Sequence, residues 1–239
     1  MVGWLCLEQR RGWRAELEQV RLASLPVLRA DVPAPSGLKE RSLLRRTGRT
    51  AALLARRGVR RVLTAPDFPL WAPLRVHGLR PVDPAPLCRA LAAPLALAQL
   101  ERLGVPPSSA AVALVGRRVD RALFQAAVSL CPQVRTLVVD APSGGVALSE
   151  HLRREFGAAA LSPDAAVHVH TTLCFSQERI SAGAFALCGP TPNLLGFSLL
   201  PPTPLPEDVD PLPLAALLWE EGRLSTREFR PVPGSFGRI

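Results

Sequence analysis

Two short apolar runs, separated by a helical pattern, constrain the fold of this chain more than any other feature. Residues 110–116 read Ala-Ala-Val-Ala-Leu-Val-Gly, and residues 134–140 read Val-Arg-Thr-Leu-Val-Val-Asp. Runs of this kind, without polar alternation, are typical of strands buried on both faces of a parallel sheet. The apolar residues of segment 120–130 recur at helical spacing. The pattern therefore predicts a strand–helix–strand unit.

The same alternation continues toward the C-terminus. It predicts a helix at 146–156 that Gly157 ends, strands at 165–170, 185–188 and 196–200, a proline-rich link at 201–213 and a helix near 213–222. Because parallel strands joined by helices form right-handed crossovers, we expect an open, mostly parallel sheet with helices on both faces. The tail after Glu228 is expected to be loose.

The first third of the chain predicts a smaller α/β arrangement. Residues 2–7 and 13–20 are expected to form a hairpin, followed by an extended connection at 26–35, which holds three prolines. Later elements are a basic helix at 38–57, with Ser36 as its N-cap and Gly58 as its stop, a strand at 60–65, a short helix at 68–76 and a helical stretch at 84–103 that bends near Pro94.

These elements predict an α/β protein with two domains. Residues 1–105 would form an N-terminal α/β domain, and residues 106–239 would form the open-sheet domain with the C-terminal helix. The length of 239 residues is sufficient for each part to bury a core of its own.

The positive charge of the chain is concentrated in its first half. The net charge is +9, and residues 39–61 hold nine basic side chains against the single acid Glu40. Arg41, Arg45 and Arg49 form a stripe at i, i+4 spacing, which suggests contact with a nucleic-acid backbone. No aromatic residue is interleaved with these arginines, and a solvated helix face is the favoured interpretation.

Composition limits the compartment and several classes of chemistry. No run of 18 apolar residues occurs, and Glu8 and Arg10 lie near the start, so neither a membrane span nor a signal peptide is expected. The chain has five cysteines, an odd number without close pairs in the sequence, which suggests a reducing cytosol. The bias toward Arg, Ala and Pro, with a single lysine, suggests a bacterial source. Tyrosine is absent, which excludes the Tyr-Lys chemistry of short-chain dehydrogenases. No G-x-S-x-G, Walker A, H-E-x-x-H or kinase signature occurs.

The segment from Gly116 to Asp140 resembles the start of a Rossmann-like nucleotide-binding domain. A buried strand ends at Gly116, a helix follows, and the next strand ends in an acid 24 positions later. The resemblance implies that Gly116, Arg117 and Arg118 approach a phosphate and that Asp140 contacts a ribose, with NAD(P) as the implied cofactor. Of the G-x-G-x-x-G pattern only the first glycine is present, because Arg118 and Arg121 stand at the other two positions.

A His/Cys cluster gives a second group of candidates. His168 and His170 alternate along the expected strand and so point to one side, and Cys174 and Cys188 follow. The spacing matches no zinc motif, so we assign no metal site and take the histidines as candidate ligand or substrate contacts at the carboxyl end of a strand. Ser143-Gly144-Gly145 is taken as a turn, and Asp67 as a cap of the helix that follows it.

Three functions remain open from these residues. The leading hypothesis is a non-catalytic or regulatory binding protein of the bacterial cytosol on a degenerate Rossmann-like scaffold. The alternatives are an NAD(P)- or other nucleotide-dependent enzyme of the oxidoreductase kind and a nucleic-acid-binding protein that uses the arginine helix. The sequence fixes no catalytic residue and no oligomeric state.

Overall fold

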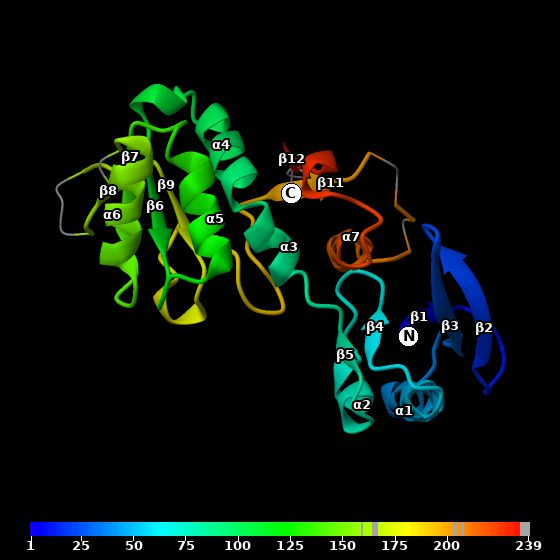
Figure 1. Ribbon diagram of the computed structural model, residues 1–239. Helices are drawn as coiled ribbons and strands as arrows, with labels where there is room; N and C mark the ends of the chain where they lie inside the picture. Colours follow the sequence, from blue (N-terminus) through cyan, green and yellow to red (C-terminus); the bar gives the residue numbers. More distant parts are fainter. Residues whose placement is uncertain (159, 164–166, 203–204, 207, 235–239) are drawn as a thin grey trace. The chain divides into compact units, whose positions relative to one another are not determined.

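The computed structural model describes residues 1–158, 160–163, 167–202, 205–206 and 208–234, and the chain folds into two compact units. Unit 1 comprises Met1–Asp83 and Thr203–Arg223, and unit 2 comprises Pro84–Pro202 and Leu224–Ile239. Both are α/β (Figure 1), as the strand and helix pattern predicts. The division differs from a boundary at residue 105, because 84–105 group with unit 2 and 203–223 return to unit 1.

Unit 1 is built on a five-stranded sheet in the order β2-β3-β1-β4-β5. β1 pairs in parallel with both β3 and β4, β5 is parallel to β4, and β2 is antiparallel to β3. The strands are β1 (Val2–Glu8), β2 (Glu16–Leu22), β3 (Leu25–Pro33), β4 (Arg61–Leu63) and β5 (Arg80–Pro81).

The N-terminal hairpin differs from the expected one. β2 turns back onto β3 rather than β1, through Ala23 and Ser24, which both have positive φ. The prediction of an extended connection at 26–35 is therefore wrong. Most of this segment is β3, the strand between β2 and β1. Pro26 is the second residue of β3 and Pro33 is its last, positions where a missing N–H costs the ladder least.

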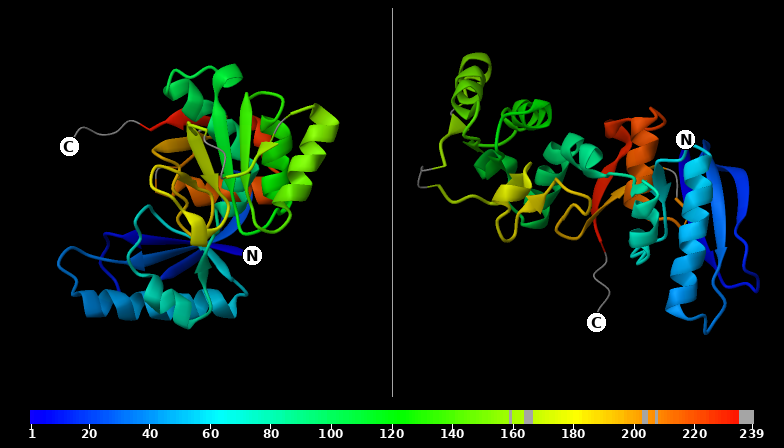
Figure 2. Two further views of the ribbon diagram at one scale, coloured as in Figure 1. Left: turned by 90° about the vertical axis from the view of Figure 1, so that its left-hand side faces the viewer. Right: turned by 90° about the horizontal axis from the view of Figure 1, so that it is seen from below.

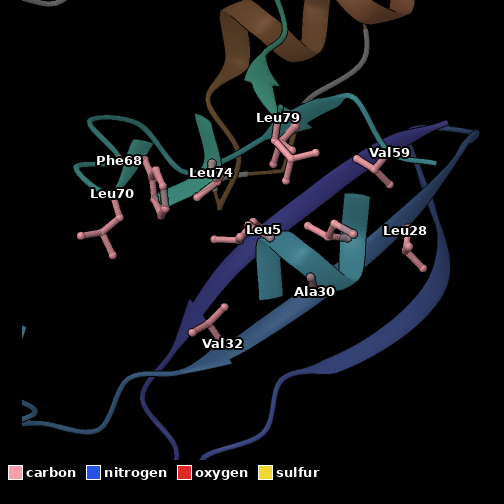
Figure 3. Close-up of a cluster of buried hydrophobic side chains, with 12 residues drawn as sticks. Leu5, Leu28, Ala30, Val32, Val59, Phe68, Leu70, Leu74 and Leu79 are labelled. Carbon is pink, nitrogen blue, oxygen red and sulfur yellow. The ribbon is translucent and has the colours of Figure 1, made fainter. Parts of the chain in front are cut away.

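Helices cover both faces of the unit 1 sheet. α1 (Glu40–Arg56) packs Ala51 and Leu54 into the core of the unit. Figure 3 shows Leu5 and Leu28 of the same core. Because side chains alternate along a strand, Val2 and Val27 point to the face opposite Leu5 and Leu28. They share a hollow with Leu217 of α7 (Pro211–Glu220), so α7 covers this other face. α2 (Trp71–Val76) lies beside α1 in both views of Figure 2.

The ends of α1 are partly as predicted. Gly58 has φ of +79° and its N–H bonds the Ala55 carbonyl, which confirms it as the stop of the helix. Lys39 occupies the N-cap position and no side chain caps the helix, so the expected Ser36 cap is wrong.

Unit 2 is built on a five-stranded sheet that is parallel throughout, in the order β10-β9-β6-β7-β8. Chain order starts at β6, moves outward through β7 to β8, and then continues on the other side of β6 with β9 and β10. This is the doubly wound order 3-2-1-4-5 read from the other edge. The strands are β6 (Ala111–Val115), β7 (Thr136–Asp140), β8 (Ala160–Leu161), β9 (Thr171–Cys174) and β10 (Phe185–Ala186).

The helices of unit 2 agree with the sequence pattern, apart from one break. The stretch expected at 84–103 is two helices that meet at Leu91, and Pro94 lies in the first turn of the second, where proline is tolerated. They are α3 (Ala85–Ala90), α4 (Ala92–Arg102), α5 (Arg121–Leu130) and α6 (Gly145–Phe156). Short 3₁₀ turns occupy Pro107–Ser109, Gln177–Arg179 and Thr226–Glu228.

Two expectations for the C-terminal half are corrected. The strand expected at 165–170 begins later, at Thr171; residues 164–166 lie outside the described part of the chain, and 167–170 are not strand. The tail expected to be loose contains β12 (Arg230–Pro233), which pairs antiparallel with β11 (Phe197–Leu200). Residues 235–239, and 203, 204 and 207 of the proline-rich link, lie outside the description. Over the described residues, no helix has the length and hydropathy that crossing a bilayer requires.

Candidate functional site

The parallel sheet of unit 2 has one point where the chain leaves in opposite directions from neighbouring strands, β6 and β9. Ligands of open α/β sheets bind beyond the carboxyl ends of the strands at such a point. A hollow of about 670 Å³ lies there, here named the switch-point hollow. Its lining residues are Arg89, Gly116, Arg117, Arg118, Asp120, Ser143, Phe175 and Ser176. The volume is within the range of small-molecule sites.

Gly116 directly follows β6 and lines the switch-point hollow, and a side chain there would crowd the packing of α5. A Cβ at this position would lie 2.9 Å from Cδ1 of Leu123, the buried residue in the first turn of α5. The absence of a side chain therefore lets α5 pack closely on the end of the strand. This is one of the roles that glycine has in nucleotide-binding turns, and it needs no cofactor.

The N-terminus of α5 is already occupied by a carboxylate. Asp120 is the N-cap, and its Oδ1 accepts a hydrogen bond of 2.9 Å from the Leu123 N–H. Its Oδ2 lies 3.6 Å from Nη1 of Arg89. A phosphate bound at the helix terminus would compete with this carboxylate, which already accepts from one terminal N–H and interacts favourably with the helix dipole. The geometry therefore favours anion binding by the loop side chains over binding by the helix end.

Arg89 of α3 is the site residue that the sequence pattern did not single out. Its Nη2 donates to the Phe175 carbonyl at 3.0 Å, and its Nε donates to the Leu187 carbonyl at 3.2 Å. It thereby ties the chain beyond β9 and β10 to the cap of α5. The one available signal was a single charged residue in the otherwise apolar helix Ala85–Ala90.

The switch-point hollow carries an excess of positive charge. Three guanidinium groups line it against the single carboxylate of Asp120. Arg117 is exposed and lies 3.8 Å from Glu178, and Arg118 is exposed with no ion pair among the described residues. The hydroxyl of Ser176 is shielded from solvent and has no hydrogen-bond partner in the described part of the chain. The site thus offers cationic donors and one free hydroxyl to a ligand.

The side chain of Asp140 lines a different hollow from the predicted phosphate-binding residues, although the Gly116 N–H donates to the Asp140 carbonyl at 2.9 Å. The loops after β6 and β7 are paired, with the Val119 N–H donating to the Ser143 carbonyl at 2.9 Å. Asp140 does not line the switch-point hollow but a second one, of about 650 Å³, between the end of β7, α6 and residues Ala158, Ala160, Ser162 and Pro163. Its carboxylate forms an ion pair with Arg179. Gly116, Arg117 and Arg118 therefore come together, and Asp140 faces a different space.

His168 and His170 lie at the amino end of the strands, and the switch-point hollow lies at their carboxyl end. Both precede β9, so the expectation that they follow a strand is wrong in its placement. Nδ1 of His170 accepts a hydrogen bond from the Ala111 N–H at 3.1 Å, and the two imidazole rings are 5.0 Å apart, edge to face. The pair therefore supports the start of the sheet, and its ligand contacts stay a prediction.

The histidines and Cys174, which form a cluster in the sequence, lie apart in the structure. His170 and Cys174 stand at opposite ends of β9, roughly 13 Å apart at about 3.3 Å per residue. Within the described residues, no group of three His, Cys, Asp or Glu side chains could hold a metal ion.

The five cysteines of the chain are free thiols, and burial raises the pKa of three of them. Burial raises the pKa of Cys6 to about 12, with a further rise from Asp31 against the opposing effect of Arg29. Burial also raises the pKa of Cys131 and Cys188. These three thiols therefore lack the thiolate form that nucleophilic catalysis requires at neutral pH.

Asp67 in unit 1 does not have the expected capping role. It has φ of +54°, and α2 begins later, at Trp71, with Leu70 as its N-cap. The pKa of Asp210 is raised, mainly because the group is buried and to a smaller extent because Asp67 is near. Asp210 caps α7 by accepting a hydrogen bond from the Leu212 N–H at 3.2 Å.

Comparisons with known proteins give no family. No protein-family model matches the chain, and no curated protein matches its sequence. L-tryptophan dehydrogenase from Nostoc punctiforme is similar at 19% identity and a TM-score of 0.31 over 72% of this chain; the match spans only 55% of the dehydrogenase. Two crystal structures of arylmalonate decarboxylase, one of them unliganded, are similar at 14% identity and TM-scores of 0.25 and 0.22, over 67% of this chain and 86% of theirs. At these scores the similarities carry no argument about function.

Proposed function

We propose that the protein is a non-catalytic or regulatory binding protein of the bacterial cytosol, and that unit 2 binds a small ligand bearing a phosphate or carboxylate group. The observation that carries the proposal is the switch-point hollow, which lies where doubly wound sheets bind ligands and has three arginines against one acid. Arg118 is the principal anion contact, since its guanidinium is exposed and engages no carboxylate among the described residues.

Binding without catalysis is supported by the donor set. The residues that line the switch-point hollow bring guanidinium, carboxylate and hydroxyl groups but neither an imidazole nor a thiol. Its only carboxylate is engaged by the Leu123 N–H and lies near Arg89. A general base needs a free group within reach of the ligand, and Asp120 is held as a helix cap instead.

The NAD(P)-dependent enzyme is the weaker candidate. A dinucleotide that used both predicted contact regions would have to pass the paired loops after β6 and β7 and displace Arg179 from Asp140. A ligand confined to the switch-point hollow meets neither obstacle. We therefore favour a compact anionic ligand over a dinucleotide.

The proposal is tested by calorimetry and thermal shift with inorganic phosphate, AMP, ATP, NAD, NADP and a panel of carboxylates. At least one anion is expected to raise the melting temperature, because a ligand that binds only the native state stabilises it. Arg118→Ala should weaken binding about tenfold or more, since a charge-assisted hydrogen bond contributes about 1.5–3 kcal/mol. Arg135→Ala is the matched control, because Arg135 is exposed in the same unit and lies outside the hollow.

Ser176→Ala separates a binding role from a structural one. Because the hydroxyl has no partner among the described residues, its removal should leave the unliganded protein as stable as before or slightly more stable. The same change should weaken binding of the anion. The proposal is wrong if no anion stabilises the protein, or if Arg118→Ala and Arg135→Ala bind it equally well.

A further inference from the structure

A second surface, independent of the switch-point hollow, lies on the solvent side of α1. Arg41, Arg45, Arg49 and Arg56 are all exposed, and at 100° per residue they fall within one narrow stripe of the helix. The residues that α1 buries, Thr47, Thr50, Ala51 and Leu54, are on the opposite side, against the core of unit 1. We call the four arginines the arginine face.

The arginine face is not neutralised within the chain. None of its four guanidinium groups forms an ion pair with a described residue, although ten such contacts exist elsewhere. The neighbouring Arg46 and Arg61 are engaged, by the Pro33 carbonyl and by Glu220. Like charges at i, i+4 destabilise a helix, so this stripe carries a cost that no described acid offsets.

We propose that the arginine face binds the phosphate backbone of a nucleic-acid duplex. Successive arginines at i, i+4 are about 6 Å apart along the axis, and the stripe from Arg41 to Arg56 is about 22 Å long. A rigid row of cations of this length fits the dense negative charge of a duplex, which carries one charge per about 1.7 Å of axis.

The chemistry of the arginine face favours a duplex over a single strand or a membrane. No aromatic side chain belongs to α1, so the face has no platform on which unpaired bases could stack. Ala51 and Leu54 are fully buried in the core, and Leu53 alone among the large apolar residues of α1 is exposed, which is too little to anchor the helix in a lipid layer. Recognition is by charge alone and therefore independent of base sequence.

The test is the salt dependence of duplex binding. Fluorescence anisotropy measures it with labelled DNA and RNA duplexes of about two helical turns. Each phosphate contact contributes about 0.9 to the slope of log K against log salt, so four arginines predict a slope near −3.6. Arg41→Ala/Arg45→Ala/Arg49→Ala should reduce its magnitude by about 2.7. Alanine is a strong helix former, so the variant should fold, which circular dichroism checks.

The control removes the same amount of charge elsewhere. Arg11→Ala/Arg121→Ala/Arg135→Ala changes three exposed arginines outside α1 and should keep the wild-type slope. Equal loss in both triple variants would mean that binding reflects net charge, and it would overturn the proposal. So would the absence of duplex binding at about 50 mM salt, a preference for single strands, or binding to anionic phosphatidylserine vesicles without binding to a duplex.

Discussion

At the scale of single residues, two glycines with opposite packing make a sharp test of the structure. Gly116→Ala should lower the free energy of unfolding by about 1–3 kcal/mol, because its Cβ would lie 2.9 Å from Leu123 and must push the side chain aside. Gly48→Ala, in the interior of α1, should raise it by about 0.5–1 kcal/mol, since the nearest atom to its Cβ is 3.7 Å away, on Pro73. Urea denaturation measures both.

The Gly116→Ala variant also tests whether contact with Leu123 is the reason for a glycine at this position. A neutral Gly116→Ala would show that Leu123 can move aside without cost, and the packing argument for this glycine would fail. The sequence pattern identified Gly116 as the end of a strand and as a residue of the site, but it could not identify Leu123 as the cause. That contact depends on how α5 turns back onto β6 in three dimensions.

At the scale of elements, the sequence predicted those whose signal is local. The buried runs that became β6 and β7 and the periodic helices α1, α5 and α6 follow from spacing alone. β3 was missed because its prolines suggest a connection and because Ala23 and Ser24, rather than a glycine, form the turn before it. Arg89 was missed for a related reason: its partners are carbonyls nearly a hundred residues away.

The N-cap of α7 gives a prediction about pH. The pKa of Asp210 is raised in the folded state by burial and by Asp67, so the native protein binds this proton more tightly than the unfolded chain does. The resulting stabilisation is complete below the unfolded pKa of about 3.9 and is lost as pH rises through the higher folded value. At neutral pH the ionised carboxylate is therefore unfavourable. Asp210→Asn, which keeps an acceptor for the Leu212 N–H, should raise the melting temperature there.

Two further measurements complete that prediction. The advantage of Asp210→Asn should shrink as pH is lowered through the folded pKa of Asp210, because the wild-type carboxyl then takes up its proton. Asp210→Ala removes the cap itself and should cost about 1 kcal/mol at neutral pH relative to the asparagine variant. A gain from Asp210→Asn that persists unchanged at acid pH would show that ionisation is not its cause.

At the scale of the whole molecule, unit 1 is discontinuous in sequence, and this determines how a local defect should spread. α7 returns to unit 1 from the far end of the chain, and its Leu217 is 1% exposed and shares a hollow with Val2 and Val27. Unit 2 has its own core, in which Leu152 of α6 is fully buried. Substitution of either leucine by alanine should cost about 2–5 kcal/mol.

The two substitutions should act on different sheets, and hydrogen exchange followed by mass spectrometry can separate them. Leu217→Ala should speed amide exchange in β1 and β3 while β6 and β7 keep their protection, although residue 217 is closer in sequence to unit 2 strands than to β1. Leu152→Ala should have the reverse effect. Equal acceleration in both sheets after either change would mean that the chain opens as one cooperative body. If the acceleration is selective, hydrogen exchange can also locate a bound ligand. An anion in the switch-point hollow should then slow amide exchange in β6 and β9 and leave exchange in β1 unchanged.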